Sequence, residues 1–178
     1  MRDSTYIKVF STARCIFHYF QIRMFHPNIG TDPQHKEGSW MEADVFLQDS
    51  DVELADLICF YRGWYYHWGI YDGDGYVIHV PAESKNGIQC TIRRENLVDV
   101  AKKVPEKTRV RIDNLYPAAC SFYCNGLKGD LQRSIETQLE AARNMIGQTV
   151  DYNFLTNNCE HFVTRCKYGY GFCTQAGT

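Results

Sequence analysis

The feature that most constrains the fold is a short turn sequence, Asp72-Gly73-Asp74-Gly75, which separates two runs rich in aromatic and β-branched residues. Gly75 can take the left-handed conformation that closes a three-residue hairpin loop. A loop of this length pairs His79 with Gly69 and places His67 diagonally across from His79. The hairpin therefore predicts that both imidazoles lie on one face of a sheet.

The rest of the chain predicts an α+β domain. Short β-like runs and segments of helical spacing alternate along it, with strands expected over 55–62, 65–71, 76–80 and 108–112 and helices over 131–146 and 158–169. Asp130 is the expected N-cap of the first helix, and Gly169 ends the second. We expect an antiparallel sheet packed against helices.

Charge divides the chain into an extension and a domain. Residues 1–36 hold five basic and two acidic residues, whereas residues 37–56 hold seven acidic residues and no basic one. Apolar positions in Val9–Met24 recur at helical spacing and predict an amphipathic helix, which covers the domain, lies on a membrane surface or belongs to a leader. The expected division is an N-terminal extension over 1–53, a folded domain over 54–170 and a short tail over 171–178.

Composition excludes several classes of protein. The 19 basic and 21 acidic residues give a net charge of -2, without the basic excess that nucleic-acid binding requires. No apolar run reaches the roughly 18 residues that span a bilayer, so any membrane contact is expected to be peripheral. The eight cysteines are too few for a disulfide scaffold in a chain of this length, and we expect most to be reduced thiols in the cytoplasm. Cys120 and Cys124 lack a second pair of ligands at finger spacing, so no metal or other cofactor is expected.

Cys159 is the candidate nucleophile. Asn157 or Asn158 can cap the last predicted helix and leave the cysteine in its first turn. Free N–H groups and the helix dipole favour a thiolate there, although this segment taken alone favours a buried structural cysteine. The hairpin histidines supply a base, whereas His161 points away from Cys159 on the helix and is expected to be structural.

Two segments resemble the histidine box and the Asn-Cys box of the lecithin:retinol acyltransferase (LRAT) domain. They are Tyr66-His67-Trp68-Gly69-Ile70-Tyr71-Asp72-Gly73-Asp74-Gly75-Tyr76-Val77-Ile78-His79 and Asn157-Asn158-Cys159-Glu160-His161-Phe162-Val163. The resemblance covers residues 54–170. Residues 62–75 are similar to the phospholipase A/acyltransferase branch, whereas residues 157–159 and 166–169 are similar to the retinol enzyme. We favour the former branch.

The resemblance implies a circularly permuted, papain-like fold of the NlpC type with an N-terminal extension. It implies that Cys159 attacks a glycerophospholipid ester, that His67 is the general base and that His79 orients it. The acyl group would pass through a thioester to water, an amine or another lipid. We expect His67 within hydrogen-bond reach of the Cys159 sulfur, and the backbone N–H of Cys159 as an oxyanion donor, because the helix N-terminus faces the developing charge.

Two other functions are compatible with these motifs. Some picornaviral proteins carry the same histidine and Asn-Cys boxes as host-interaction modules, and the permuted relatives include amidases and peptidases. Lipid hydrolysis by the purified protein, compared with a Cys159→Ala variant, separates these readings from a phospholipase A/acyltransferase.

Overall fold

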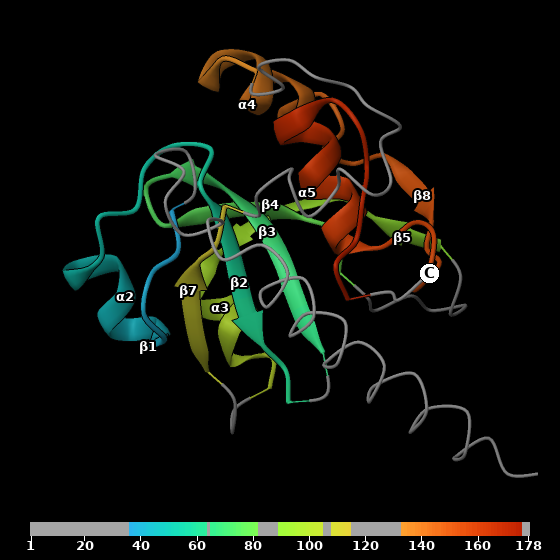
Figure 1. Ribbon diagram of the computed structural model, residues 1–178. Coiled ribbons are helices and arrows are strands. Elements are labelled where there is room, and N and C mark those ends of the chain that lie inside the picture. Colours follow the sequence, from blue (N-terminus) through green and yellow to red (C-terminus); the bar gives the residue numbers. More distant parts are fainter. Residues whose placement is uncertain (1–35, 64, 82–88, 105–107, 115–132, 176–178) are drawn as a thin grey trace, which may run out of the picture.

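The computed structural model describes residues 36–63, 65–81, 89–104, 108–114 and 133–175 (Figure 1). Within them, six antiparallel strands form the main sheet in the order β1-β7-β2-β3-β4-β6. Their bounds are β1 (Met41–Glu42), β7 (Arg109–Ile112), β2 (Leu57–Tyr61), β3 (Tyr66–Gly73), β4 (Tyr76–His79) and β6 (Arg93–Asn96). Two further strands, β5 (Gln89–Thr91) and β8 (Thr149–Asp151), form a small second sheet. The expected α+β class with an antiparallel sheet is confirmed.

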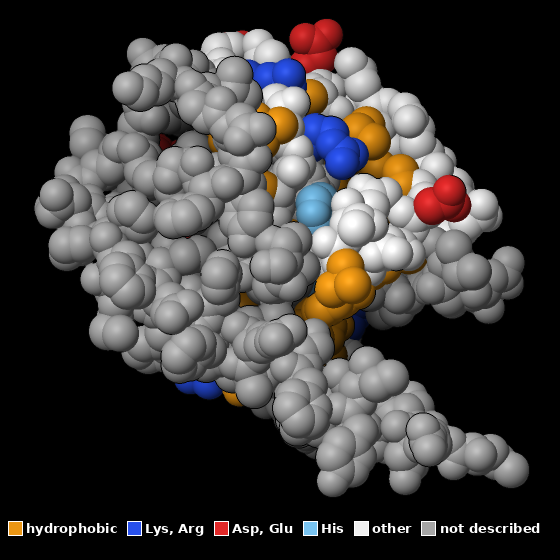
Figure 2. Space-filling model, turned by 45° about the vertical axis from the view of Figure 1, so that its right-hand side comes forward, with side chains coloured by type: hydrophobic (Ala, Val, Ile, Leu, Met, Phe, Trp, Pro, Cys, Tyr) orange, Lys and Arg blue, Asp and Glu red, His pale blue; other side chains and the backbone are white. Residues whose placement is uncertain are grey.

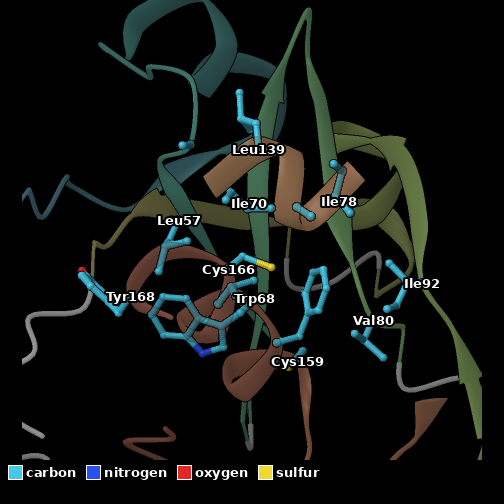
Figure 3. Packing of buried hydrophobic residues seen from close by; sticks show 14 of the residues in the cluster. Leu57, Trp68, Ile70, Ile78, Val80, Ile92, Leu139, Cys159, Cys166 and Tyr168 are labelled. Atoms are coloured by element: carbon cyan, nitrogen blue, oxygen red, sulfur yellow. The ribbon is translucent and has the colours of Figure 1, made fainter. Parts of the chain in front are cut away.

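Helices cover both faces of the main sheet. On one face lie α2 (Ala43–Asp49) and α3 (Leu97–Lys102), and on the other lie α4 (Ile135–Arg143) and α5 (Cys159–Tyr168) (Figure 1). Side chains of β2 point alternately to the two faces of the sheet and so contribute to both hydrophobic cores. Ile58 and Phe60 lie in the core on the side of α2 and α3. Leu57 and Cys59 lie in the core on the side of α4 and α5. Figure 3 shows the second core, in which Trp68 of β3 packs with residues of α5.

The hairpin of β3 and β4 has the predicted register. Gly69 pairs with His79, and Gly75 has a positive φ of 77°. The loop is tighter than predicted, because Gly73 pairs with Tyr76 and the extra residue forms a bulge before the turn. His67 pairs with Phe60 in β2, so His67 and His79 lie on the face that α3 covers.

The two other helices predicted from the sequence are not both described by the structure. The first predicted helix is shorter than expected, running from Ile135 to Arg143 with Ser134 as its N-cap, and the expected cap, Asp130, lies outside the described residues. The predicted helix over Val9–Met24 also lies outside them. N-terminal of residue 54, α2 contributes the buried Phe46 to the core. No helix in the described ranges is both long and apolar enough to cross a bilayer.

Candidate active site

The N-terminus of α5 is built by Asn158. Its side-chain oxygen accepts hydrogen bonds from the backbone N–H groups of Glu160 at 2.9 Å and His161 at 3.1 Å. The His161 side chain completes a capping box with the backbone of Asn158, which is the structural role expected for it. Of the two asparagines considered, Asn158 is therefore the cap, and Cys159 is the first residue of the helix. Its backbone N–H is one of the groups at a helix start that lack an acceptor within the helix.

Cys159 lies in an apolar environment where the start of α5 packs against β3 (Figure 3). Its side chain is only 2% exposed. Burial raises the pKa of the Cys159 thiol to about 12, although a hydrogen bond from the Trp68 backbone and one from the Tyr152 hydroxyl, at 3.9 Å, lower it in part. The expectation of a thiolate stabilised by the helix terminus is thus wrong for the resting site, because desolvation outweighs the helix. The resting Cys159 side chain is therefore a neutral thiol.

The two histidines form a buried pair on the opposite face of β3. Nε2 of His67 lies 2.7 Å from Nδ1 of His79, and the rings are nearly perpendicular at 84°. Burial, followed by electrostatic repulsion between the two imidazoles and by the positive charges of Arg62 and Lys103, holds the pKa of His67 well below its usual value of 6.5. His67 is therefore a neutral imidazole near pH 7, which is the form that can accept a proton. Burial also lowers the pKa of His79, so this ring too is neutral near pH 7.

His79 has a second partner that the sequence did not reveal. Its Nε2 lies 2.6 Å from a carboxylate oxygen of Glu95 in β6, and the same oxygen accepts a hydrogen bond from Lys103 at 2.9 Å. The hydrogen bond from His79 lowers the pKa of Glu95 to about 2, so the carboxylate is ionised. Glu95 reaches His79 because β6 pairs with β4, with Val77 opposite Glu95.

A pocket opens beside the histidine pair. Its lining consists of side chains from both the sheet and the α3 end, namely Arg62, Tyr65, His67, His79, Pro81, Val100, Lys103 and Val104. The histidines are thus reachable from outside despite their burial. The described residues contain no group of three His, Cys, Asp or Glu side chains suited to a metal ion.

The structure brings the two histidines together but does not join them to the cysteine by a hydrogen bond. Among the described residues, the Cys159 sulfur has hydrogen bonds with the backbones of Trp68 and Glu160 and with the Tyr152 hydroxyl, and none with His67. His67 and Trp68 are consecutive in β3, so their side chains point to opposite faces. The sulfur binds the backbone of Trp68, which directly follows His67 in β3. The expected hydrogen bond between the Cys159 sulfur and His67 is not present.

The remaining described cysteines do not share this placement. Cys59, Cys90 and Cys166 are buried members of the core, as expected, and each of these three is a free thiol. Cys173 differs, because its sulfur lies 2.9 Å from the buried carboxylate of Glu160.

Glu160 fastens the residues after α5 to the active-site strand. The carboxylate accepts hydrogen bonds from the backbone and hydroxyl of Thr174, both at 2.6 Å, and from the Gln175 amide at 3.0 Å. The same Gln175 amide group bonds both backbone groups of Tyr66, at 2.6 and 2.9 Å. The residue before His67 is thus held from the C-terminal side of the chain.

We expect Glu160→Ala to lower the free energy of unfolding by about 1–3 kcal/mol, because it leaves several donors without their buried acceptor. Urea denaturation measures this loss, and faster amide exchange at Tyr66 reports release of the strand. Glu140→Ala, on the exposed side of α4, is the control and should change stability by less than about 0.5 kcal/mol. Equal stability of the two variants would contradict the role given to Glu160.

Comparison with known proteins identifies the family of the chain. The sequence pattern of the family described as Lecithin retinol acyltransferase matches residues 50–171. Human phospholipase A and acyltransferase 4 is 35% identical over 124 residues, covering 68% of this chain and 73% of that protein. Human phospholipase A and acyltransferase 1 is 33% identical over 133 residues, covering 68% and 71%, respectively. The chain therefore belongs to the lecithin retinol acyltransferase family, on the side of the phospholipase A and acyltransferases.

Proposed function

We propose that the protein is a thiol-dependent phospholipase A and acyltransferase. The observation that carries the proposal is a neutral, buried His67, held by His79, beside the strand position that Cys159 contacts. The names of its relatives, phospholipase A and acyltransferase, support the same class of reaction. The antiparallel sheet covered by helices is also compatible with a circularly permuted, NlpC-type papain-like fold, which we propose as its ancestry.

The proposed reaction has two steps. His67 takes the proton of the Cys159 thiol as the sulfur attacks the ester carbonyl of a glycerophospholipid, and the backbone N–H of Cys159 stabilises the oxyanion. The ester bond breaks, and the departing lysophospholipid oxygen takes the proton from His67. Water, an amine or another lipid then attacks the thioester and releases Cys159 as a thiol. Because the resting sulfur has no hydrogen bond to His67, the proposed proton transfer requires the two side chains to come within hydrogen-bond distance when the substrate binds.

Exposed apolar side chains beside the nucleophile suit a lipid substrate. Phe154 and Leu155 precede Cys159 and are 43% and 55% exposed. The turn that carries them is fixed by Asn153, whose side chain accepts hydrogen bonds from the backbones of Leu155 and Thr156. Figure 2 shows hydrophobic side chains at the surface of one face, with basic side chains between them. Contact with acyl chains would bury such side chains.

We further propose the division of labour along the chain. Residues 54–170 carry the catalytic groups. Residues 1–53 form an extension, of which Ala43 and Phe46 pack in the core, and residues 171–178 form a tail, of which Thr174 and Gln175 bind Glu160. Peripheral contact of Val9–Met24 with anionic membranes, and a cytoplasmic location, complete the proposal. Vesicle sedimentation of the full chain against a version starting at Glu42 tests the membrane role, and equal binding would contradict it.

Product analysis tests the proposed function. The purified protein is incubated with mixed phospholipid vesicles, with and without an amine acceptor, and the lipids are identified by mass spectrometry. We expect lysophospholipid and free fatty acid, and an N-acyl product when the amine is present. Absence of all three products would favour the host-interaction module, and hydrolysis of peptides or amides alone would favour an amidase or peptidase.

The pH dependence of the reaction provides a separate prediction. The pKa of His67 is lowered by burial and by His79, Arg62 and Lys103, so His67 remains neutral and basic down to below pH 6.5. We therefore expect kcat/KM to stay level between pH 7.5 and 6.5 and to fall only at lower pH, as His67 becomes protonated. A pH series with vesicles of fixed composition measures this, and an acidic fall centred above pH 6.5 would contradict the assignment of His67 as base.

A further inference from the structure

Glu95 ends a chain of contacts that begins at the proposed base. The chain runs from His67 to His79 at 2.7 Å, from His79 to Glu95 at 2.6 Å and from Glu95 to Lys103 at 2.9 Å. Both histidines are almost fully buried, at 4% and 1% exposure, whereas the Glu95 side chain is 27% exposed. Four residues from four segments of the sheet and its α3 face are therefore joined in one line.

The carboxylate of Glu95 decides where His79 holds its proton. An ionised carboxylate can only accept hydrogen bonds, so the partner atom, Nε2 of His79, must carry the hydrogen. In a neutral imidazole the other ring nitrogen then has a lone pair. Nδ1 of His79 is consequently an acceptor, and it faces His67.

The same reasoning passes to His67. Because Nδ1 of His79 accepts, Nε2 of His67 must donate, and the lone pair of the neutral His67 ring is left on Nδ1. We propose that Glu95 is a positioning residue that fixes the tautomers of both histidines, so that Nδ1 of His67 is the atom that takes the proton of Cys159. This inference rests on the proposed function for its catalytic consequence, but not for the proton positions.

The charge of Glu95 has a second consequence. When His67 accepts a proton it becomes a buried cation that faces His79, Arg62 and Lys103, of which the last two are already positive. Glu95 is the negative group at the far end of the His67–His79–Glu95 chain of contacts, so its carboxylate offsets part of the positive charge on His67. Lys103 holds the carboxylate in place through its own ion pair.

The test combines nitrogen-15 NMR of the histidine rings with kinetics on phospholipid vesicles at pH 7.5. In the unmodified protein we expect both His67 and His79 to carry hydrogen on Nε2. In Glu95→Ala we expect mixed tautomers at both rings and a kcat lower by about 10- to 100-fold with little change in KM. In Glu95→Gln, whose amide oxygen can still accept from His79 but carries no charge, we expect retained tautomers, an intermediate kcat and an acidic limb at lower pH.

Several outcomes would overturn the inference. They are a hydrogen on Nδ1 of His67 in the unmodified protein, and unchanged tautomers and kcat in a folded Glu95→Ala variant. Glu140→Ala on α4 is the matched control and should leave spectra and rates unchanged. If Glu95→Ala fails to fold, the unmodified protein and Glu95→Gln carry the test. Predicted tautomers in a protein without acyl transfer would support the inference and refute the proposed function.

Discussion

Replacing Cys159 with serine is expected to lower acyl transfer and lipid hydrolysis by at least about 10⁴-fold, because a serine hydroxyl is a far weaker nucleophile and the same base must activate it. The substitution changes one atom at a site that is 2% exposed, so the fold should persist. Release of lysophospholipid from vesicles measures the rate, and intact-protein mass spectrometry detects an acyl group on the unmodified protein and none on the variant.

Cys166→Ala is the matched control, since Cys166 lies two helical turns further along α5 and is equally buried. Its activity should stay close to that of the unmodified protein. An acyl-directed probe should label Cys159 faster than Cys59 or Cys166, whose thiol pKa values burial also raises. Equal labelling of these cysteines, or a serine variant with more than a tenth of the original rate, would remove Cys159 from its proposed role.

His67→Ala is expected to slow the reaction by roughly 10²- to 10⁴-fold, the usual contribution of a general base. The loss matters more here than at an exposed site, because the high pKa of the Cys159 thiol leaves almost no thiolate at neutral pH. Single-turnover kinetics on vesicles measures thioester formation directly and separates it from product release.

His79→Gln is expected to be milder than His67→Ala. A glutamine amide has an oxygen to accept from His67 and an NH₂ group to donate to Glu95, so it can occupy the middle of this chain of contacts. If His79→Gln were the slower of the two variants, the roles of base and orienting residue would have to be exchanged.

The hairpin and the helix start were predictable because local chemistry determines them. The turn at Gly75 sets the pairing of Gly69 with His79, and the side chain of Asn158 sets the first residue of α5. Those two features alone predict the sheet face of both histidines and the position of Cys159 at the start of α5. The helix predicted over 131–146, by contrast, is longer than the observed helix α4, because apolar residues at helical spacing continue beyond the segment that Ser134 caps.

The chemistry that depends on distant contacts was not predictable. Glu95 reaches His79 only because β6 joins the edge of β4, and the run around Glu95 carries no signal that distinguishes it from a solvated charge. Tyr152 reaches Cys159 because β8 pairs with β5 and brings the residue after it to the helix. The thiol pKa was misjudged for the same reason, since burial of Cys159 depends on how α5 packs on β3.

The hydrogen bonds between the Gln175 side chain and the Tyr66 backbone have a consequence for folding during translation. These residues are 109 positions apart, and α5 also follows β3 by a long stretch of chain. During translation both histidines therefore leave the ribosome well before the nucleophile does. Until then the sheet face of Trp68, Ile70 and Ile78 has no α5 to cover it, so a nascent chain is an expected client of chaperones. The same order means that the histidine pair is complete in the chain before Cys159, the thiol that we propose it activates, has been synthesised.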